Sequence, residues 1–195
     1  MVTTFYPPYN FGGDGIFVQR LARALVNRGH SVEVIHDTDA YRMMSGRAPE
    51  VEFEDDGVRV HRLRSPHKFM SSLGVQQLGR PTTHKERLTE LLAALFEDPT
   101  RKIVLFSEWK KMLDRIESRM EELGADYVRL DGQVPQKKRA SIIARFQNDP
   151  ECRVICMTNA GSTGLNLQAA NTVINVDLPW NPAVLEQRIA RAYRM

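Results

Sequence analysis

The sequence predicts an α/β protein of three layers, in which a mainly parallel sheet carries helices on both faces. Short runs rich in Val, Ile and Leu, such as 103–106 and 154–157, are typical of strands buried on both sides of a parallel sheet. Amphipathic stretches of about 10–15 residues separate these runs, which is the pattern of β-α-β crossovers. The composition, 42% hydrophobic and 26% charged, is ordinary for a globular protein.

The first 64 residues predict one partial α/β segment. A short strand at 2–6 precedes a turn-rich loop that contains Gly12, Gly13 and Gly15. Amphipathic spacing then predicts a helix, and Gly29 is suited to end it. The predicted elements of this segment are a helix at 16–27, a strand at 31–36, an acidic loop at 52–56 and a strand at 58–63.

A linker is predicted at 65–84, where Pro, Gly, Ser and Gln occur with weak periodicity. The segment 85–195 then alternates helices and strands. The predicted helices lie at 85–97, 110–123 and 136–146, and a last one opens at 180–182; the predicted strands lie at 103–106, 127–130, 154–157 and 172–177. Whether the N-terminal strands join the same sheet stays open at this point.

The charge and cysteine patterns exclude several classes of function. The net charge is +3 without a polybasic tail, so nucleic-acid binding would need a local basic patch. Cys152 and Cys156 lie at i, i+4, about 13 Å apart along a strand, too far for a disulfide. We therefore expect reduced cysteines, no metal site and a cytoplasmic protein. No apolar run predicts a membrane span or a signal peptide.

The residues after the strand at 154–157 predict a phosphate site. The loop 158–164 is rich in small residues, and in parallel sheets ligands bind at the carboxyl ends of the strands. Arg188, Arg191 and Arg194 follow at helical spacing, and guanidinium groups bind phosphate oxygens in pairs. Taken alone, the loop could also be a plain turn and the arginines a solvated helix face.

Residues 85–195 resemble the second RecA-like lobe of superfamily 2 helicases, specifically of the Swi/Snf-type DNA translocases. Four stretches carry the resemblance in order: 103–109 (IVLFSEW, motif IV), 127–146 (with its Asp-Gly turn), 154–182 (motif V and its extension) and 187–194 (QRIARAYR, motif VI). The resemblance implies a RecA-like fold, double-stranded DNA as a partner and a first lobe that this sequence does not contain.

The resemblance also implies roles for individual residues. Arg191 and Arg194 match arginine fingers that reach the γ-phosphate of ATP on the other lobe, and Gln187 matches the polar opener of that motif. Gly164, Asn166 and Arg188 are expected near the nucleotide. Ser107 and Thr158 are expected to contact the DNA backbone.

The nucleotide site is incomplete in this sequence. No G-x-x-x-x-G-K-[ST] loop and no Asp-Glu-x-His-type motif occurs. We therefore expect ATP with magnesium to bind only if a first lobe is supplied, and no cofactor to bind to this chain alone. Since arginine fingers act on a nucleotide held elsewhere, the chain alone should not hydrolyse ATP.

The N-terminal residues resemble the start of a glycosyltransferase family 4 enzyme of the GT-B fold, which is Rossmann-like. The stretch from Phe5 to Asp37, followed by DGVRVHRL, carries this resemblance. It implies a sugar-nucleotide or phosphate loop at Gly12, Gly13 and Gly15, although these glycines could simply turn the chain. A third hypothesis is a non-enzymatic fusion of two truncated modules. The oligomeric state and the DNA specificity stay undetermined.

Overall fold

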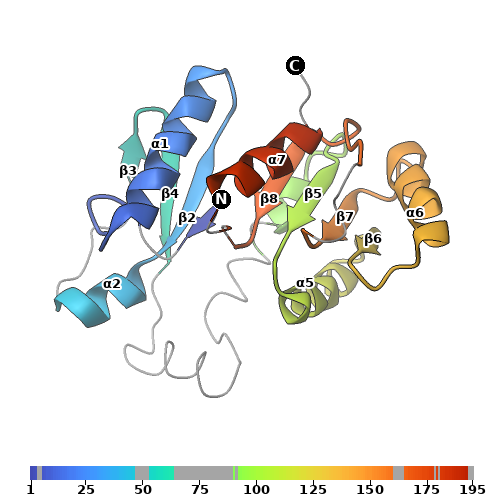
Figure 1. Cartoon of the computed structure of the whole chain (residues 1–195), viewed down its shortest axis with the longest axis horizontal. Helices are drawn as coiled ribbons and strands as arrows, with labels where there is room; N and C mark the ends of the chain where they lie inside the picture. Colours follow the sequence, from blue (N-terminus) through green and yellow to red (C-terminus); the bar gives the residue numbers. More distant parts are fainter. Residues whose placement is uncertain are drawn as a thin grey trace. The chain divides into compact units, whose positions relative to one another are not determined.

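The computed structural model describes residues 1–3, 6–46, 53–63, 90, 92–159, 165–177, 179 and 181–192 (Figure 1). The chain divides into two compact units, Met1–Leu91 and Leu92–Met195, and each unit has its own four-stranded sheet. The N-terminal strands therefore do not join the sheet of the second unit. The predicted linker at 65–84 lies outside the described residues.

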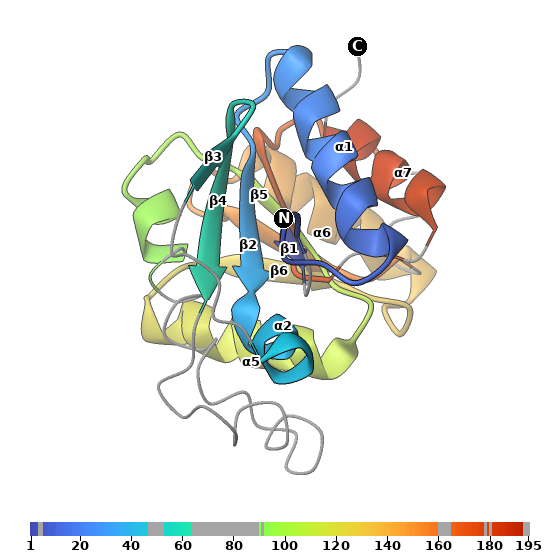
Figure 2. The same ribbon diagram turned by 90° about the vertical axis from the view of Figure 1, so that its left-hand side faces the viewer.

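The sheet of the first unit has the strand order β1-β2-β4-β3. Figure 2 shows β2, β3 and β4 of this sheet. The strands β1 (Val2–Thr3), β2 (Glu33–Asp37) and β4 (Val58–Leu63) are parallel, and β3 (Phe53–Asp55) runs antiparallel to β4. The helices α1 (Gly13–Asn27) and α2 (Thr38–Ser45) both contact β4.

Two predictions for the first unit are wrong, and one helix was missed. The expected acidic loop at 52–56 contains the strand β3, because Asp56 and Gly57 adopt φ of 49° and 81° and turn the chain into a hairpin. The helix α2 was not expected. The helix α1 begins at Gly13 rather than residue 16, directly after Gly12, whose φ of 93° favours glycine.

Asp55 joins β3 to the remainder of the first unit. Its carboxylate accepts hydrogen bonds from the Tyr6 hydroxyl and the Gln19 amide, both at 2.8 Å, and forms an ion pair with Arg23. Burial by itself would raise the pKa of Asp55, but the hydrogen bonds from Arg23, Gln19 and Tyr6 outweigh it and hold the pKa below its ordinary value. The charged form of Asp55 therefore stabilises this unit.

The stability of the first unit should depend on the charge of Asp55. Because the pKa is lower in the folded state, the stabilisation is present above the unfolded value of about 3.9 and is lost as the pH falls through the folded pKa. Asp55→Asn should lower the free energy of unfolding by roughly 1–3 kcal/mol at pH 7 and weaken the acid dependence. Urea unfolding at pH 7 and below pH about 4 measures both; an unchanged acid dependence would contradict this role.

The sheet of the second unit is entirely parallel and has the order β6-β7-β5-β8. Its strands are β5 (Ile103–Phe106), β6 (Tyr127–Leu130), β7 (Val154–Met157) and β8 (Thr172–Asn175). Every residue of the central strands β5 and β7 is buried, as their continuous apolar sequence predicts. The prediction of an α/β protein with a mainly parallel sheet is confirmed.

Helices cover both faces of this sheet, which gives the predicted three layers. Alternate strand residues, including Phe106 and Leu130, form one core cluster with Phe146 of α6 (Gln136–Asn148) and Ala192 of α7 (Pro182–Ala192). Arg129 lies between the β6 residues of that cluster and therefore faces the opposite side. There it pairs with Asp114 and Glu117 of α5 (Lys110–Glu122).

The predicted element boundaries of the second unit agree closely with the structure. The strands at 103–106, 127–130 and 154–157 are confirmed, whereas the strand predicted to reach 177 ends at residue 175. Of the helix predicted at 85–97, residues 90 and 92–96 are described and are helical. No described helix has the length and apolar character that a membrane crossing requires.

Candidate functional site

A depression of about 450 Å³ lies where three strands of the second unit end. Its lining comes from the residues that follow β5, β6 and β7, at the edge where parallel α/β sheets bind ligands. The lining residues are Glu108, Lys110, Gly132, Gln133, Thr158 and Asn159. Thr158, one of the predicted site residues, is therefore among the lining residues, whereas Lys110, Gly132 and Gln133 were not singled out as site residues.

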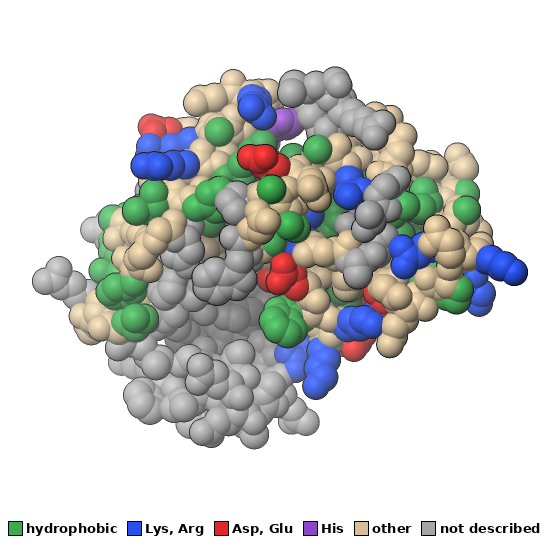
Figure 3. Space-filling model, viewed as in Figure 1, with side chains coloured by type: hydrophobic (Ala, Val, Ile, Leu, Met, Phe, Trp, Pro, Cys, Tyr) green, Lys and Arg blue, Asp and Glu red, His purple; other side chains and the backbone are tan. Residues whose placement is uncertain are grey.

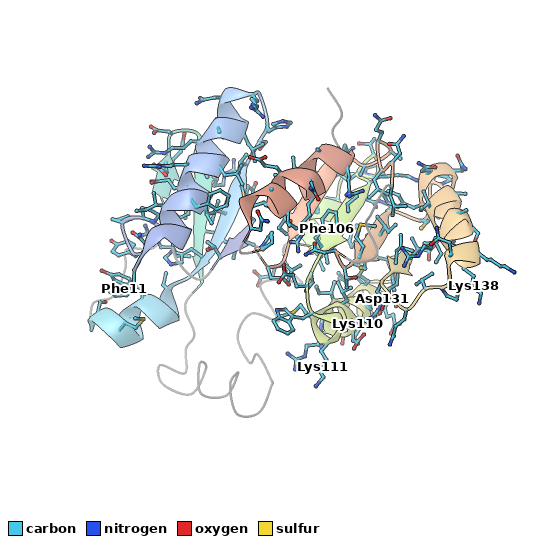
Figure 4. The ribbon with its side chains drawn as sticks, viewed as in Figure 1. Phe11, Phe106, Lys110, Lys111, Asp131 and Lys138 are labelled. Atoms are coloured by element: carbon cyan, nitrogen blue, oxygen red, sulfur yellow. The ribbon has the colours of Figure 1, made fainter. Side chains whose placement is uncertain are left out.

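Lys110 supplies positive charge to this depression. It opens α5, where the helix dipole also favours an anion, and Figure 4 shows it near the same end of the sheet as Asp131. Over the face drawn in Figure 3, lysine and arginine side chains lie interspersed with acidic ones. In the lining of the depression Lys110 is accompanied by the acidic Glu108.

The turn after β6 is held in shape by charged side chains. Asp131 is buried, and its carboxylate accepts a hydrogen bond from the Gln133 backbone N–H at 2.8 Å and another from Arg129 Nε at 3.0 Å. Burial would raise the pKa of Asp131, but these hydrogen bonds and the charge of Arg129 lower it below its ordinary value. Gly132 and Gln133 are thus presented to the depression by a fixed turn.

Ser107 is fully buried, and its hydroxyl donates to the Asp177 carboxylate at 2.5 Å. The same carboxylate accepts the Glu108 backbone N–H at 2.9 Å, so it joins the residues that follow β5 and β8. Because Phe106 pairs with Asn175 in the sheet, the two segments leave the sheet side by side. Ser107 is thus not among the lining residues of the depression.

Arg188 is buried, with only 1% of its surface exposed. Its Nε donates to Asn159 Oδ1 at 2.8 Å, and its Nη1 donates to the Asp177 backbone carbonyl at 2.8 Å and to Asn175 Oδ1 at 3.3 Å. Nη2 lies 3.7 Å from Glu108 Oε1 and 3.6 Å from Asp177 Oδ1. The side chain therefore joins α7 to the residues that follow β5, β7 and β8.

Burial affects the proton affinity of this guanidinium. Desolvation lowers the pKa of Arg188, and the nearby carboxylates of Asp177 and Glu108 oppose that shift. The Cζ atom lies 5.3 Å from the centre of the Phe106 ring, so the guanidinium also stacks over β5. Phe106 is labelled in Figure 4, close to α7.

Arg191 lies one helical turn after Arg188 and is only partly buried. Its backbone carbonyl accepts the Leu167 N–H at 3.1 Å, which places Arg191 beside the residue that follows Asn166. Burial lowers the pKa of Arg191. Gln187 is exposed on the same helix. The structure therefore brings the predicted residues Asn166 and Arg191 close together.

Other predicted site residues lie elsewhere or outside the described part of the chain. Arg194 and Gly164 are outside the described residues. Gly12, Gly13 and Gly15 belong to the first unit, where Gly12 precedes α1 and the other two lie in its first turn. Both cysteines are buried in their reduced form. Within the described ranges, no three His, Cys, Asp or Glu side chains converge to hold a metal ion.

Comparison with known proteins matches the second unit to one family. The family described as "Helicase conserved C-terminal domain" matches residues 83–195. A zebrafish (Danio rerio) SWI/SNF-related, matrix-associated, actin-dependent regulator of chromatin, subfamily A containing DEAD/H box 1A, is 42% identical over 109 residues, which cover 55% of this chain and 11% of that protein. The DNA repair protein RAD5 of Cryptococcus neoformans is 34% identical over 142 residues, which cover 71% of this chain and 12% of that protein.

Solved structures support the same relationship. The C-terminal part of the Fun30 ATPase domain superposes with a TM-score of 0.54 at 31% identity, covering 58% of this chain and 37% of that one. The Sulfolobus solfataricus SWI2/SNF2 ATPase core domain gives a TM-score of 0.51 at 29% identity, covering 63% of this chain and 26% of that one. The chain thus spans only about a tenth of the length of the two curated relatives described above.

Proposed function

Because the chain belongs to the helicase conserved C-terminal domain family, we propose that its second unit is the second lobe of a Swi/Snf-type DNA-dependent ATPase. One structural observation supports this proposal in addition to family membership. The depression lined by Lys110 and Thr158 is joined through Arg188 to the helix with Arg191, which supports the proposal that one compact unit contributes both a contact with the DNA backbone and an arginine for the nucleotide. A translocating lobe requires both.

The depression is the proposed contact with the DNA backbone. Lys110 supplies charge, and the exposed Gly132 allows close approach of the backbone, while Thr158 lines the depression as a buried residue. The proposed partner is double-stranded DNA, in keeping with the relatives that are named as a chromatin regulator and a DNA repair protein. These contacts read no base, so we expect binding without strong sequence preference.

The salt dependence of duplex binding tests this surface. Lys110→Ala should lower the slope of log K against log salt concentration by about 0.9, the value for one phosphate that is no longer neutralised. Lys138→Ala is the matched control, because Figure 4 shows Lys138 pointing outward from α6. Fluorescence anisotropy of a labelled duplex, measured from low to physiological salt, gives both slopes. If Lys110→Ala and Lys138→Ala gave the same salt slope, the proposed contact of Lys110 with the DNA backbone would be contradicted.

ATP would be shared with a first lobe. The residues that this chain would direct at it are Arg191, whose partly buried guanidinium is suited to a phosphate, and Arg194, with Gln187 exposed nearby. ATP when bound would supply the phosphoryl group that is transferred to water. The magnesium and the phosphate-binding loop are proposed to come with the first lobe. DNA-stimulated ATP hydrolysis by the purified chain alone would refute this division of labour.

For the first unit, a separate hypothesis is that it binds a sugar nucleotide. The resemblance to glycosyltransferase family 4 implies a sugar-nucleotide loop at the glycines around the start of α1, where Gly12 precedes the helix and Gly13 and Gly15 lie in its first turn. A Cβ at Gly13 would meet no atom within 4 Å, so Gly13→Glu can be used to add charge at this position. Loss of nucleotide-sugar binding in that variant would support the hypothesis, and no binding by the wild type would end it. The fusion of two modules and the cytoplasmic location likewise stay predictions.

A further inference from the structure

We propose that Arg188 is a positioning residue that couples the depression to α7, the helix that also carries Arg191, and that it does not itself bind phosphate. This inference rests on the proposed function of the second unit and assigns Arg188 a role different from the nucleotide contact that the sequence predicts. The first observation is that Arg188 is buried. A side chain with 1% of its surface exposed, whose Nε and Nη1 already donate to protein oxygens, has little surface to offer a ligand.

Arg188 connects the depression with the helix that carries Arg191. Asn159 and Glu108 line the depression, whereas Arg188 is on the same helix as Arg191, three residues away. A shift of α7 would therefore pull on two lining residues. The reverse also holds, because a ligand that moved Asn159 would change the hydrogen bond that anchors α7.

The side-chain amide of Asn159 links Arg188 to Glu108. Its Oδ1 accepts from Arg188 Nε at 2.8 Å, and its Nδ2 donates to Glu108 Oε1 at 3.2 Å, so both ends of the amide have partners. An amide is required here, because a carboxylate would face Glu108 and a shorter side chain would reach neither partner. The Asn159–Arg188 hydrogen bond is thus one direct link between the depression and α7, beside the Arg188–Glu108 ion pair.

The planar fork of Arg188 is also required. Its nitrogens reach Asn159, Asn175 and the Asp177 carbonyl in three directions, which a single ammonium group does not reproduce. Arg188→Lys therefore keeps the positive charge beside Glu108 and Asp177 but loses the geometry. The variant therefore separates the charge of Arg188 from its hydrogen-bond geometry.

A double-mutant cycle on duplex binding by the full chain tests the coupling. Arg188→Lys and Asn159→Ala should each weaken binding about tenfold, and the double variant should bind no more weakly than the weaker single variant. The salt slope should stay at the wild-type value, because every charged group that neutralises a phosphate is still present. Effects that multiply in the double variant would overturn the proposal, as would wild-type affinity in Arg188→Lys.

Hydrogen exchange separates this proposal from the proposed function. Arg188→Lys should accelerate exchange both in α7 and in the amides at Thr158 and Asn159, while Arg115→Lys on the exposed face of α5 should change neither. Acceleration confined to α7 would overturn the coupling. This measurement needs no ligand, so a wild-type chain that binds no duplex would refute the DNA contact and still leave Arg188 tested. Asn159→Ala gives the same comparison if Arg188→Lys does not fold.

Discussion

Replacing Arg191 with alanine is expected to lower DNA-stimulated ATP hydrolysis about 10³-fold once a first lobe is supplied. The reason is electrostatic. A guanidinium that is partly removed from water interacts strongly with the charge that develops on a transferring phosphoryl group. Burial lowers the pKa of Arg191, yet an arginine side chain ordinarily loses its proton only in strongly alkaline solution, so the group stays charged at neutral pH.

The measurement compares turnover and duplex affinity for the same variants. The chain is combined with a first ATPase lobe, in trans or by covalent fusion, and steady-state hydrolysis is followed with and without duplex. Arg191→Ala should lose turnover while its duplex affinity stays within about twofold, because Arg191 does not line the depression. Arg115→Ala is the control on α5. Unimpaired turnover in Arg191→Ala would remove this residue from the nucleotide site.

Truncating Phe106 should destabilise the second unit by about 3–5 kcal/mol, the range for large-to-small changes of buried aromatic residues. Phe106 is fully buried, ends the central strand β5 and belongs to the core cluster that α6 and α7 cover. Phe106→Ala would leave a cavity and remove the ring over which Arg188 stacks. The destabilisation should therefore reach the candidate site as well as the core.

Urea unfolding followed by circular dichroism measures this effect. Trp109→Ala is the control: Trp109 lies three residues further on with 68% of its surface exposed, so its removal should change stability by less than about 0.5 kcal/mol. Unfolding is analysed as two transitions, because the chain has two compact units. If Phe106→Ala lowered the stability by less than about 1 kcal/mol, the central position of this ring would be contradicted.

Hydrophobic periodicity was sufficient to predict most of the second unit. The strands at 103–106, 127–130 and 154–157 are fully or half buried in a parallel sheet, so their apolar sequence identifies them. The first unit was harder to predict. Phe53–Asp55 has two acidic residues, and its strand depends on the turn at Asp56 and Gly57 and on partners of Asp55 far away in the sequence.

Part of the candidate site was equally predictable. Thr158 follows a buried strand, and the rule for parallel sheets places such residues at the binding edge. Lys110 and Gln133 were missed, although each follows a predicted strand closely and the same rule could have found them. The cluster of Glu108, Asp177 and Arg188 was missed because its members are up to 80 residues apart, and only the pairing of β5 with β8 brings two of them together.

The sequence by itself determined the order of strands and helices in the second unit, the position of Thr158 at the end of β7 and the presence of Arg188 and Arg191 on the last helix. Only the tertiary structure decided which of those arginines is buried and which keeps part of its surface exposed. Spacing at i, i+3 and i+6 places residues on one side of a helix but does not say how deep each will lie. Arg188 is buried because α7 packs over Phe106 at this point, while Arg191, one turn later, keeps part of its surface exposed.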